Sequence, residues 1–245
     1  MPCKLSVNLN AVAYLRNRRH VPWPDLVKLG RIALEAGAAG LTVHPRPDER
    51  HIRRADVPLI AALVREYPGC EFNIEGYPDE GFMGLVETHR PHQVTLVPDL
   101  PGQSTSDHGW DFATQHNFLG TVIDRIKIAG MRSSVFIDPD EAAPAMAKAV
   151  GADRVEIFTG PYGGTLEADA VQREFLRVEA TGIAAEKAGV GLNAGHDLTR
   201  ANLPALVSAL PNLAEVSIGH AIFADAWELG LAETVKQFRA AIGDL

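Results

Sequence analysis

The sequence is poor in features that several protein classes depend on. Its two cysteines, Cys3 and Cys70, have neither metal-ligand nor redox spacing, which suits a reducing compartment and a fold without disulfides. No apolar run reaches the length that spans a bilayer. The first residues lead directly into an apolar strand, without the pattern of a signal peptide. We therefore expect a soluble cytoplasmic protein with no membrane partner.

Positive charge is also in deficit. The net charge is -8, from 23 Lys and Arg against 31 Asp and Glu, which argues against a nucleic-acid partner. No lysine falls at the end of a predicted strand, so an aldolase with a Schiff-base lysine is disfavoured. A G-x-S-x-G motif is absent, and the first strand lacks the G-x-G-x-x-G turn of dinucleotide-binding sheets.

What is present is a regular alternation of short apolar strands and amphipathic helices. Strands are predicted over 5–8, 40–44, 71–75, 93–98, 132–138, 154–159, 191–195 and 215–219. Helices are predicted over 24–37, around 57–64, over 81–88, 111–129 and 141–150, around 171–189, and over 202–210 and 221–242. Eight such units favour a closed (β/α)8 barrel, the TIM barrel, as a single domain over 1–245. A doubly wound open sheet is the alternative.

Chemically competent side chains stand at the ends of these strands: Asn8, His44, Glu75, His196 and His220. Active sites of this fold lie at that rim, so we expect the five to face one site. His44 suits proton transfer near neutral pH. Glu75 would have a raised pKa if shielded from water, although a structural salt bridge to an arginine is the alternative. Glu156, inside the sixth strand, is predicted to point into the barrel and orient a catalytic group.

Arginines gather in the loops after the first two strands: Arg16, Arg18, Arg19, Arg46, Arg50, Arg53 and Arg54. In an acidic protein this cluster favours an anionic ligand, although a solvent face paired with carboxylates explains it equally well. Arg46 and His51 suit a phosphate or a carboxylate. Gly195-His196 and Gly219-His220 end the seventh and eighth strands, where this fold commonly binds phosphate. Each histidine alone also fits a structural role.

Taken together, these segments resemble the pyridoxine 5'-phosphate synthase family along essentially the whole chain. The resemblance rests on Asn8 and on 15–17, 40–46, 50–52, 96–98, 136–138, 193–196 and 218–221. It implies a (β/α)8 barrel that assembles as a homo-octamer and uses neither a cofactor nor a metal. It also implies the reaction, a condensation of 3-amino-2-oxopropyl phosphate with 1-deoxy-D-xylulose 5-phosphate that releases inorganic phosphate and water.

The resemblance further implies roles for individual residues. His44 and Glu75 would accept protons, and His196 would donate one. The phosphate of the amino ketone would be held by Asn8, Arg19, Gly219 and His220. The phosphate of the deoxyxylulose would be held by Arg46, His51 and Thr105. Thr105 lies in the long polar loop 99–109, which we expect to cover the site.

The chain departs from the commoner family pattern at several positions. It has Asn10-Ala11 where Asp-His is expected, Asp197 where a substrate-contacting glycine is expected, and Phe158 where histidine is frequent. The resemblance connects that Asp-His pair with the deoxyxylulose phosphate, and Ala11 cannot form a side-chain hydrogen bond to it. Two alternatives stay open. One is a metal-dependent hydrolase or isomerase on the same barrel, although close ligand pairs are missing. The other is a non-catalytic barrel that binds phosphorylated ligands.

Overall fold

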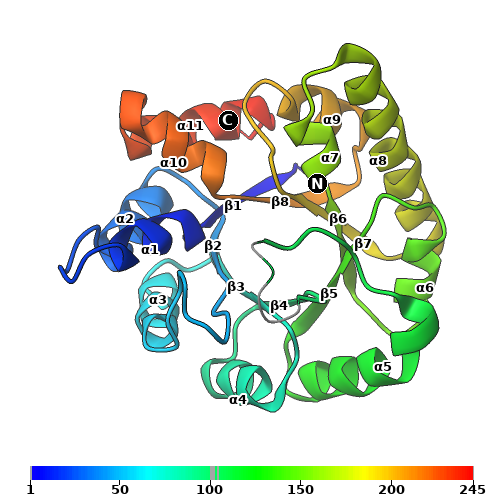
Figure 1. The fold of residues 1–245 in the computed structure, drawn as a ribbon, viewed down its shortest axis with the longest axis horizontal. Coiled ribbons are helices and arrows are strands. Elements are labelled where there is room, and N and C mark those ends of the chain that lie inside the picture. Colours follow the sequence, from blue (N-terminus) through cyan, green and yellow to red (C-terminus); the bar gives the residue numbers. More distant parts are fainter. Residues whose placement is uncertain (1, 100–102, 104, 245) are drawn as a thin grey trace.

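The computed structural model describes residues 2–99, 103 and 105–244; positions 100–102 and 104 of the predicted long loop lie outside this range. Eight parallel strands close into a barrel in chain order, and β1 pairs with β8 (Figure 1). They are β1 Lys4–Asn8, β2 Gly40–Val43, β3 Glu71–Gly76, β4 Gln93–Leu96, β5 Arg132–Ile137, β6 Arg154–Phe158, β7 Gly191–Gly195 and β8 Leu213–Ile218. The prediction of a (β/α)8 barrel is confirmed.

Helices surround this barrel on its outer face (Figure 1). In the described ranges they are α1 Asn10–Asn17, α2 Leu26–Glu35, α3 Asp56–Arg65, α4 Glu80–His89, α5 Phe112–Ile128, α6 Ala143–Ala149, α7 Gly160–Gly164, α8 Ala168–Ala188, α9 Leu203–Ala209, α10 His220–Leu229 and α11 Leu231–Ala241. The predicted helix around 171–189 is α8, which ends at the left-handed cap residue Gly189, with a φ of 65°.

The predicted helices were wrong at three places. Residues 10–17, for which the sequence predicts no helix, form α1. Residues 160–164, also outside the predicted helices, form the short helix α7, whose early proline suits a first turn. The predicted last helix is divided into α10 and α11 at Gly230, whose φ of 78° breaks the helical path. In addition, α2 begins at Leu26 rather than at Pro24, because the Asp25 side chain caps its first N–H groups.

The barrel interior is polar rather than filled with branched apolar side chains. Alternate strand residues point to opposite faces, so the apolar ones pack against the helices and the polar ones face inward. Inside, Ser6 bonds Thr42 at 2.7 Å, and the buried Glu215 accepts from Gln93 at 3.3 Å and from Asn193 at 3.4 Å. These hydrogen bonds connect inward-facing polar side chains of different strands. The polar lining that they form extends up to the rim of the barrel.

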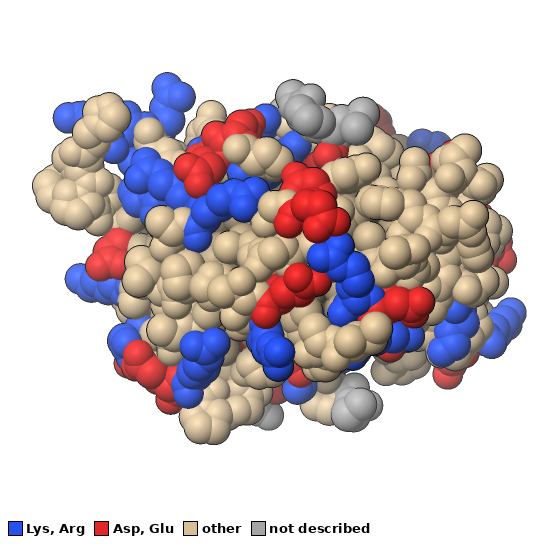
Figure 2. All heavy atoms as spheres, turned by 90° about the horizontal axis from the view of Figure 1, so that it is seen from below, with Lys and Arg blue, Asp and Glu red and all other residues tan. Residues whose placement is uncertain are grey.

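The outer surface carries charges of both signs. Figure 2, drawn from below relative to Figure 1, shows basic and acidic side chains interspersed over that face. Arg125 of α5, for example, pairs with Glu80 at 2.8 Å and with Glu87 at 3.0 Å. Among the described helices, none combines the length and the apolar character that a membrane crossing requires.

Close packing of neighbouring strands predicts that Gly40 and Gly84 differ in how well they tolerate a side chain. A Cβ at Gly40 of β2 would collide with the carbonyl oxygen of Glu71 on β3, whereas Gly84 of α4 has nothing within 4 Å of that position. We expect Gly40→Ala to lower the free energy of unfolding by about 1–3 kcal/mol. The control Gly84→Ala should leave it unchanged or raise it by up to about 1 kcal/mol. Urea denaturation measures both, and equal effects would contradict this account of the barrel.

Candidate active site

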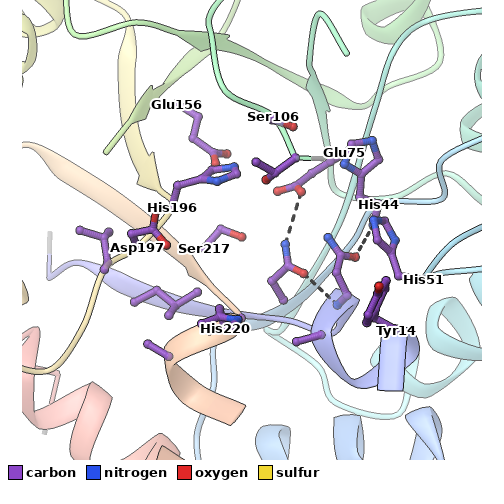
Figure 3. Close-up of a pocket in the computed structure, with 18 of the residues that line it drawn as sticks. Tyr14, His44, His51, Glu75, Ser106, Glu156, His196, Asp197, Ser217 and His220 are labelled. Carbon is purple, nitrogen blue, oxygen red and sulfur yellow. Dashed lines mark hydrogen bonds between the residues drawn. The ribbon is translucent and has the colours of Figure 1, made fainter. Parts of the chain in front are cut away.

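One cavity of about 310 Å³ opens at the C-terminal rim of the barrel. Among the described residues it is lined by Asn8, Asn10, Ala11, Tyr14, His44, Arg46, His51, Glu75, Thr105, Ser106, Glu156, His196, Asp197, Leu198, Ser217, Ile218, Gly219, His220 and Ala221. Figure 3 shows the labelled side chains converging on this space from strands, loops and the helices α1 and α10. Of the residues predicted for the site, Arg19 alone does not line it.

Glu75 lies buried at the end of β3 and faces the cavity. Its Oε2 accepts a hydrogen bond of 3.4 Å from Nδ2 of Asn8, and none of the ion pairs among the described residues joins it to an arginine. Burial, together with the negative charges of Asp99 and Glu215, raises the pKa of Glu75 to about 8. The predicted rise is therefore confirmed, and the salt-bridge alternative was wrong.

Glu156 of β6 is a second buried carboxyl group at the cavity. Burial and the charge of Glu75 raise its pKa well above the ordinary value, and its Oε2 has no hydrogen-bond partner in the described structure. A side chain at Gly195 would collide with its Oε1, so Gly195 is required for this close approach. The prediction that Glu156 points into the barrel is confirmed.

A chain of hydrogen bonds fixes the strand ends relative to one another. The backbone N–H of His44 donates to Oδ1 of Asn10 at 2.9 Å, and the backbone N–H of Asn10 donates to Oδ1 of Asn8 at 3.0 Å. The second bond orients the Asn8 amide so that its NH2 group faces Glu75 (Figure 3). Asn10 thus links β1 to β2, a role that the sequence did not reveal.

His44 and His51 are both biased toward the neutral form. Burial lowers the pKa of His44 well below its usual value, and the charges of His51 and Arg46 act in the same direction. Burial also lowers the pKa of His51, to about 4. Nδ1 of His51 accepts the N–H of Ile52 at 2.9 Å, which places the ring proton on Nε2. Two neutral imidazoles therefore stand 5.8 Å apart, centroid to centroid, at one side of the cavity.

His196 and Asp197 follow β7 in an uncommon backbone conformation. Their φ angles are 81° and 55°, in the left-handed region that favours glycine. Aspartate tolerates this region better than most residues, which gives a physical reason why this position can carry Asp197 in place of glycine. The His196 ring packs 5.3 Å from the rings of both Phe136 and Phe158, and burial lowers its pKa. Phe158 therefore supports His196 by packing.

Several arginines of the predicted cluster form ion pairs with aspartates. Arg16 pairs with Asp56 at 2.7 Å and Arg50 pairs with Asp48, while Arg19 lies exposed after α1. Arg46 is the one member that lines the cavity, and its buried guanidinium pairs with Asp99 at 2.6 Å. Three of the seven arginines, Arg16, Arg46 and Arg50, thus pair with carboxylates, so this alternative explains part of the cluster.

The N-terminus of α10 forms the opposite side of the cavity. The helix begins at His220, and Gly219 precedes it without any side-chain cap. Its first N–H groups are therefore available to an anion. A Cβ at Gly219 would lie 2.7 Å from the carbonyl oxygen of Asn8, so only glycine fits there.

Several lining residues carry no sequence signal, because they are neither charged nor in a segment that carries the family resemblance: Tyr14, Ser106, Leu198 and Ser217. Their position at the cavity can be inferred only once the pairing register of the barrel strands is known. In the described ranges, no three His, Cys, Asp or Glu side chains are arranged to hold a metal ion.

Barrel and cavity define a (β/α)8 enzyme site in which buried acids and bases lie beside the Arg46 guanidinium and the N-terminus of α10. The chain belongs to the family of the pyridoxal phosphate biosynthesis protein PdxJ, whose model matches residues 5–244. The family resemblance noted from the sequence is thus confirmed, and the chain is an enzyme of vitamin B6 biosynthesis.

Curated relatives agree with this placement. The pyridoxine 5'-phosphate synthase of Allorhizobium ampelinum is 60% identical over 249 residues, which cover 100% of both chains. That of Chelativorans sp. is 61% identical over 245 residues, covering 98% of this chain and 99% of the relative. Among solved structures, thiamine phosphate pyrophosphorylase from Pyrococcus furiosus matches with a TM-score of 0.63 and 14% identity, over 99% of this chain and 96% of that one. This last likeness shows the fold alone.

The raised pKa of Glu75 predicts how stability depends on pH. The folded protein holds this proton up to about pH 8, whereas the unfolded chain releases it near 4.5, so stability is lost as pH rises through that window. We expect Glu75→Gln to remove the loss and to raise the free energy of unfolding above pH 8 by as much as about 5 kcal/mol.

Near pH 4 the variant and the natural protein should be equally stable, because Glu75 is then protonated in both states. Glu141→Gln, at an exposed carboxylate, is the control and should show no such dependence. Urea denaturation at several pH values measures the effect, and a difference that did not change with pH would contradict the assignment.

Proposed function

We propose that this enzyme condenses 3-amino-2-oxopropyl phosphate with 1-deoxy-D-xylulose 5-phosphate to form pyridoxine 5'-phosphate, inorganic phosphate and water, with residues 1–245 acting as one catalytic domain. The observation that carries the proposal is the convergence of Glu75, His44 and His196 on one cavity between two groups of anion-binding residues. The first substrate supplies the amine that attacks the ketone of the second, so the protein has to supply proton transfers rather than a nucleophile.

The ionisation states of the cavity residues support these roles in proton transfer. With a pKa of about 8, Glu75 is mostly protonated near neutral pH, and it gives up its proton before it can accept one. The lowered pKa values of His44 and His196 leave both rings neutral and able to accept a proton. A bound phosphate dianion favours the imidazolium form, so substrate binding prepares His196 to donate.

Two anion sites are proposed at opposite sides of the cavity. The amino-ketone phosphate would bind at the N-terminus of α10, where Gly219 and His220 meet Asn8. The deoxyxylulose phosphate would bind beside Arg46, His51 and Thr105. Asp197 would contribute at the rim after β7. Arg19 lies outside the cavity, and its role stays a prediction.

The proposed reaction has a direct test. Purified protein given both substrates should release phosphate and form a product with pyridine absorbance. His44→Ala and Glu75→Gln should each lower turnover by about 100-fold or more, because each removes a proton-transfer group. The control is His116→Ala, at an exposed histidine of α5, which should retain full turnover. Absence of product at high enzyme concentration would contradict the proposal.

We also propose that the protein works in the cytoplasm as a homo-octamer, as the family resemblance implies. Helices α1 and α10 pack together and expose Leu15, Trp227 and Leu229 by 47%, 80% and 40%. Exposed apolar side chains of this size favour an interface. Light scattering should give the mass of about eight chains, and Trp227→Glu should lower it. A natural protein that stayed monomeric at micromolar concentration would contradict the assembly.

A further inference from the structure

The side chain of Asp99, three residues after β4, joins several parts of the site. It is only 7% exposed. Its Oδ2 accepts a bond of 2.6 Å from Nη1 of Arg46 and one of 2.8 Å from the hydroxyl of Ser106. Nε2 of His44 lies 3.9 Å from the same oxygen. Asp99 does not line the cavity, so any influence it has on a substrate is exerted through these neighbours.

The ion pair with Arg46 fixes a guanidinium that could not otherwise remain buried. Arg46 is 4% exposed, and a buried charge is tolerated only with a partner. Because the guanidinium is planar, engaging Nη1 also sets the direction of its remaining N–H donors. Asp99 therefore determines which way Arg46 presents its donors to the cavity.

The bond with Ser106 fixes the neighbouring chain segment. Ser106 is buried and lines the cavity together with the exposed Thr105 before it. One carboxylate oxygen thus holds the Thr105–Ser106 segment and the Arg46 guanidinium in a single arrangement. Arg46 and Thr105 are two of the three residues that the family resemblance connects with the deoxyxylulose phosphate.

We propose that Asp99 is a positioning residue of the proposed synthase, which holds Arg46 and the Thr105–Ser106 segment against the deoxyxylulose phosphate and places a negative charge behind the proton-transfer groups. This inference rests on the proposed function. It concerns a residue that contacts no substrate and acts through the side chains that do.

The negative charge of Asp99 affects the pKa values of Glu75 and His196. After burial, it is the largest cause that raises the pKa of Glu75. Burial lowers the pKa of His196, and Asp197 and Asp99 oppose that effect. The other ionisable groups that line the cavity are Tyr14, His44, Arg46, His51, Glu156 and His220, and the charge of Glu215 also acts on Glu75. Removing the charge of Asp99 alone should therefore lower the pKa of Glu75.

The experiment compares Asp99→Asn with Asp107→Asn. Asp107 is an exposed carboxylate of the same loop that pairs with His108, so its substitution removes an equal charge without touching Arg46. Initial rates are measured with both substrates from about pH 6 to about pH 9. For Asp99→Asn we expect the KM for the deoxyxylulose phosphate to rise about 10- to 100-fold, with a smaller change for the amino ketone.

The pH profile supplies a readout that a purely structural role would not change. In Asp99→Asn, the limb of the pH–rate profile that reflects ionisation of Glu75 should move to lower pH by about half a pH unit or more. Asp107→Asn should leave this limb in place. Ser106→Ala keeps every charge and removes one hydrogen bond. It should raise the KM for the deoxyxylulose phosphate about 3- to 10-fold without moving the profile.

Each possible result of these comparisons either supports or overturns the proposal for Asp99. If Asp99→Asn matches Asp107→Asn in KM and in pH profile, Asp99 is not a positioning residue. If Asp99→Asn does not fold, Ser106→Ala decides, and an unchanged KM overturns the proposal. A natural protein that forms no product overturns the proposed function itself, so the two failures are distinguishable.

Discussion

Withdrawal of carboxyl groups from water inside the closed barrel is the constraint on which the rest of the structure depends. The strand alternation sends apolar side chains toward the helices and leaves the interior to polar ones, among them Glu75, Glu156 and Glu215. All three have raised pKa values, and burial is the main cause for each. For Glu75 the cost of burial is limited because protonation near neutral pH removes the charge, while the amides of Asn8 and Gln93 donate hydrogen bonds to Glu75 and Glu215.

Function follows from this constraint at the rim. A carboxyl group held near its neutral form can give a proton at physiological pH and later take one back, which an exposed glutamate cannot do efficiently. Burial also lowers the pKa values of the histidines beside it, and the proposed mechanism has an anionic substrate favour their protonation. Side-chain and backbone bonds through Asn8 and Asn10 hold these groups in register, so the geometry exists before the substrates bind.

The sequence allowed the strands and the strand-end residues to be predicted, because short apolar runs separated by helices favour one parallel topology. Glu75 and Glu156 could be placed at the cavity for the same reason. Asn10, Asp99 and Ser106 could not, since their roles depend on contacts between loops that are distant in sequence. The arginine cluster misled in part, because composition does not tell an anion site from ion pairs such as that of Arg16 with Asp56. Helix α7 was missed because a glycine-rich segment resembles a loop, and α1 because it has only eight residues and no side-chain N-cap to mark its start.

The central claim is that burial in the barrel mouth keeps Glu75 protonated at neutral pH. It is tested most directly by carbon-13 NMR of the protein labelled at its glutamate carboxyl carbons. The Glu75 resonance is assigned by its disappearance in Glu75→Gln. The account predicts that this resonance titrates with a pKa of about 8 in the substrate-free protein. A titration near the ordinary glutamate value, about 4.3, would contradict it.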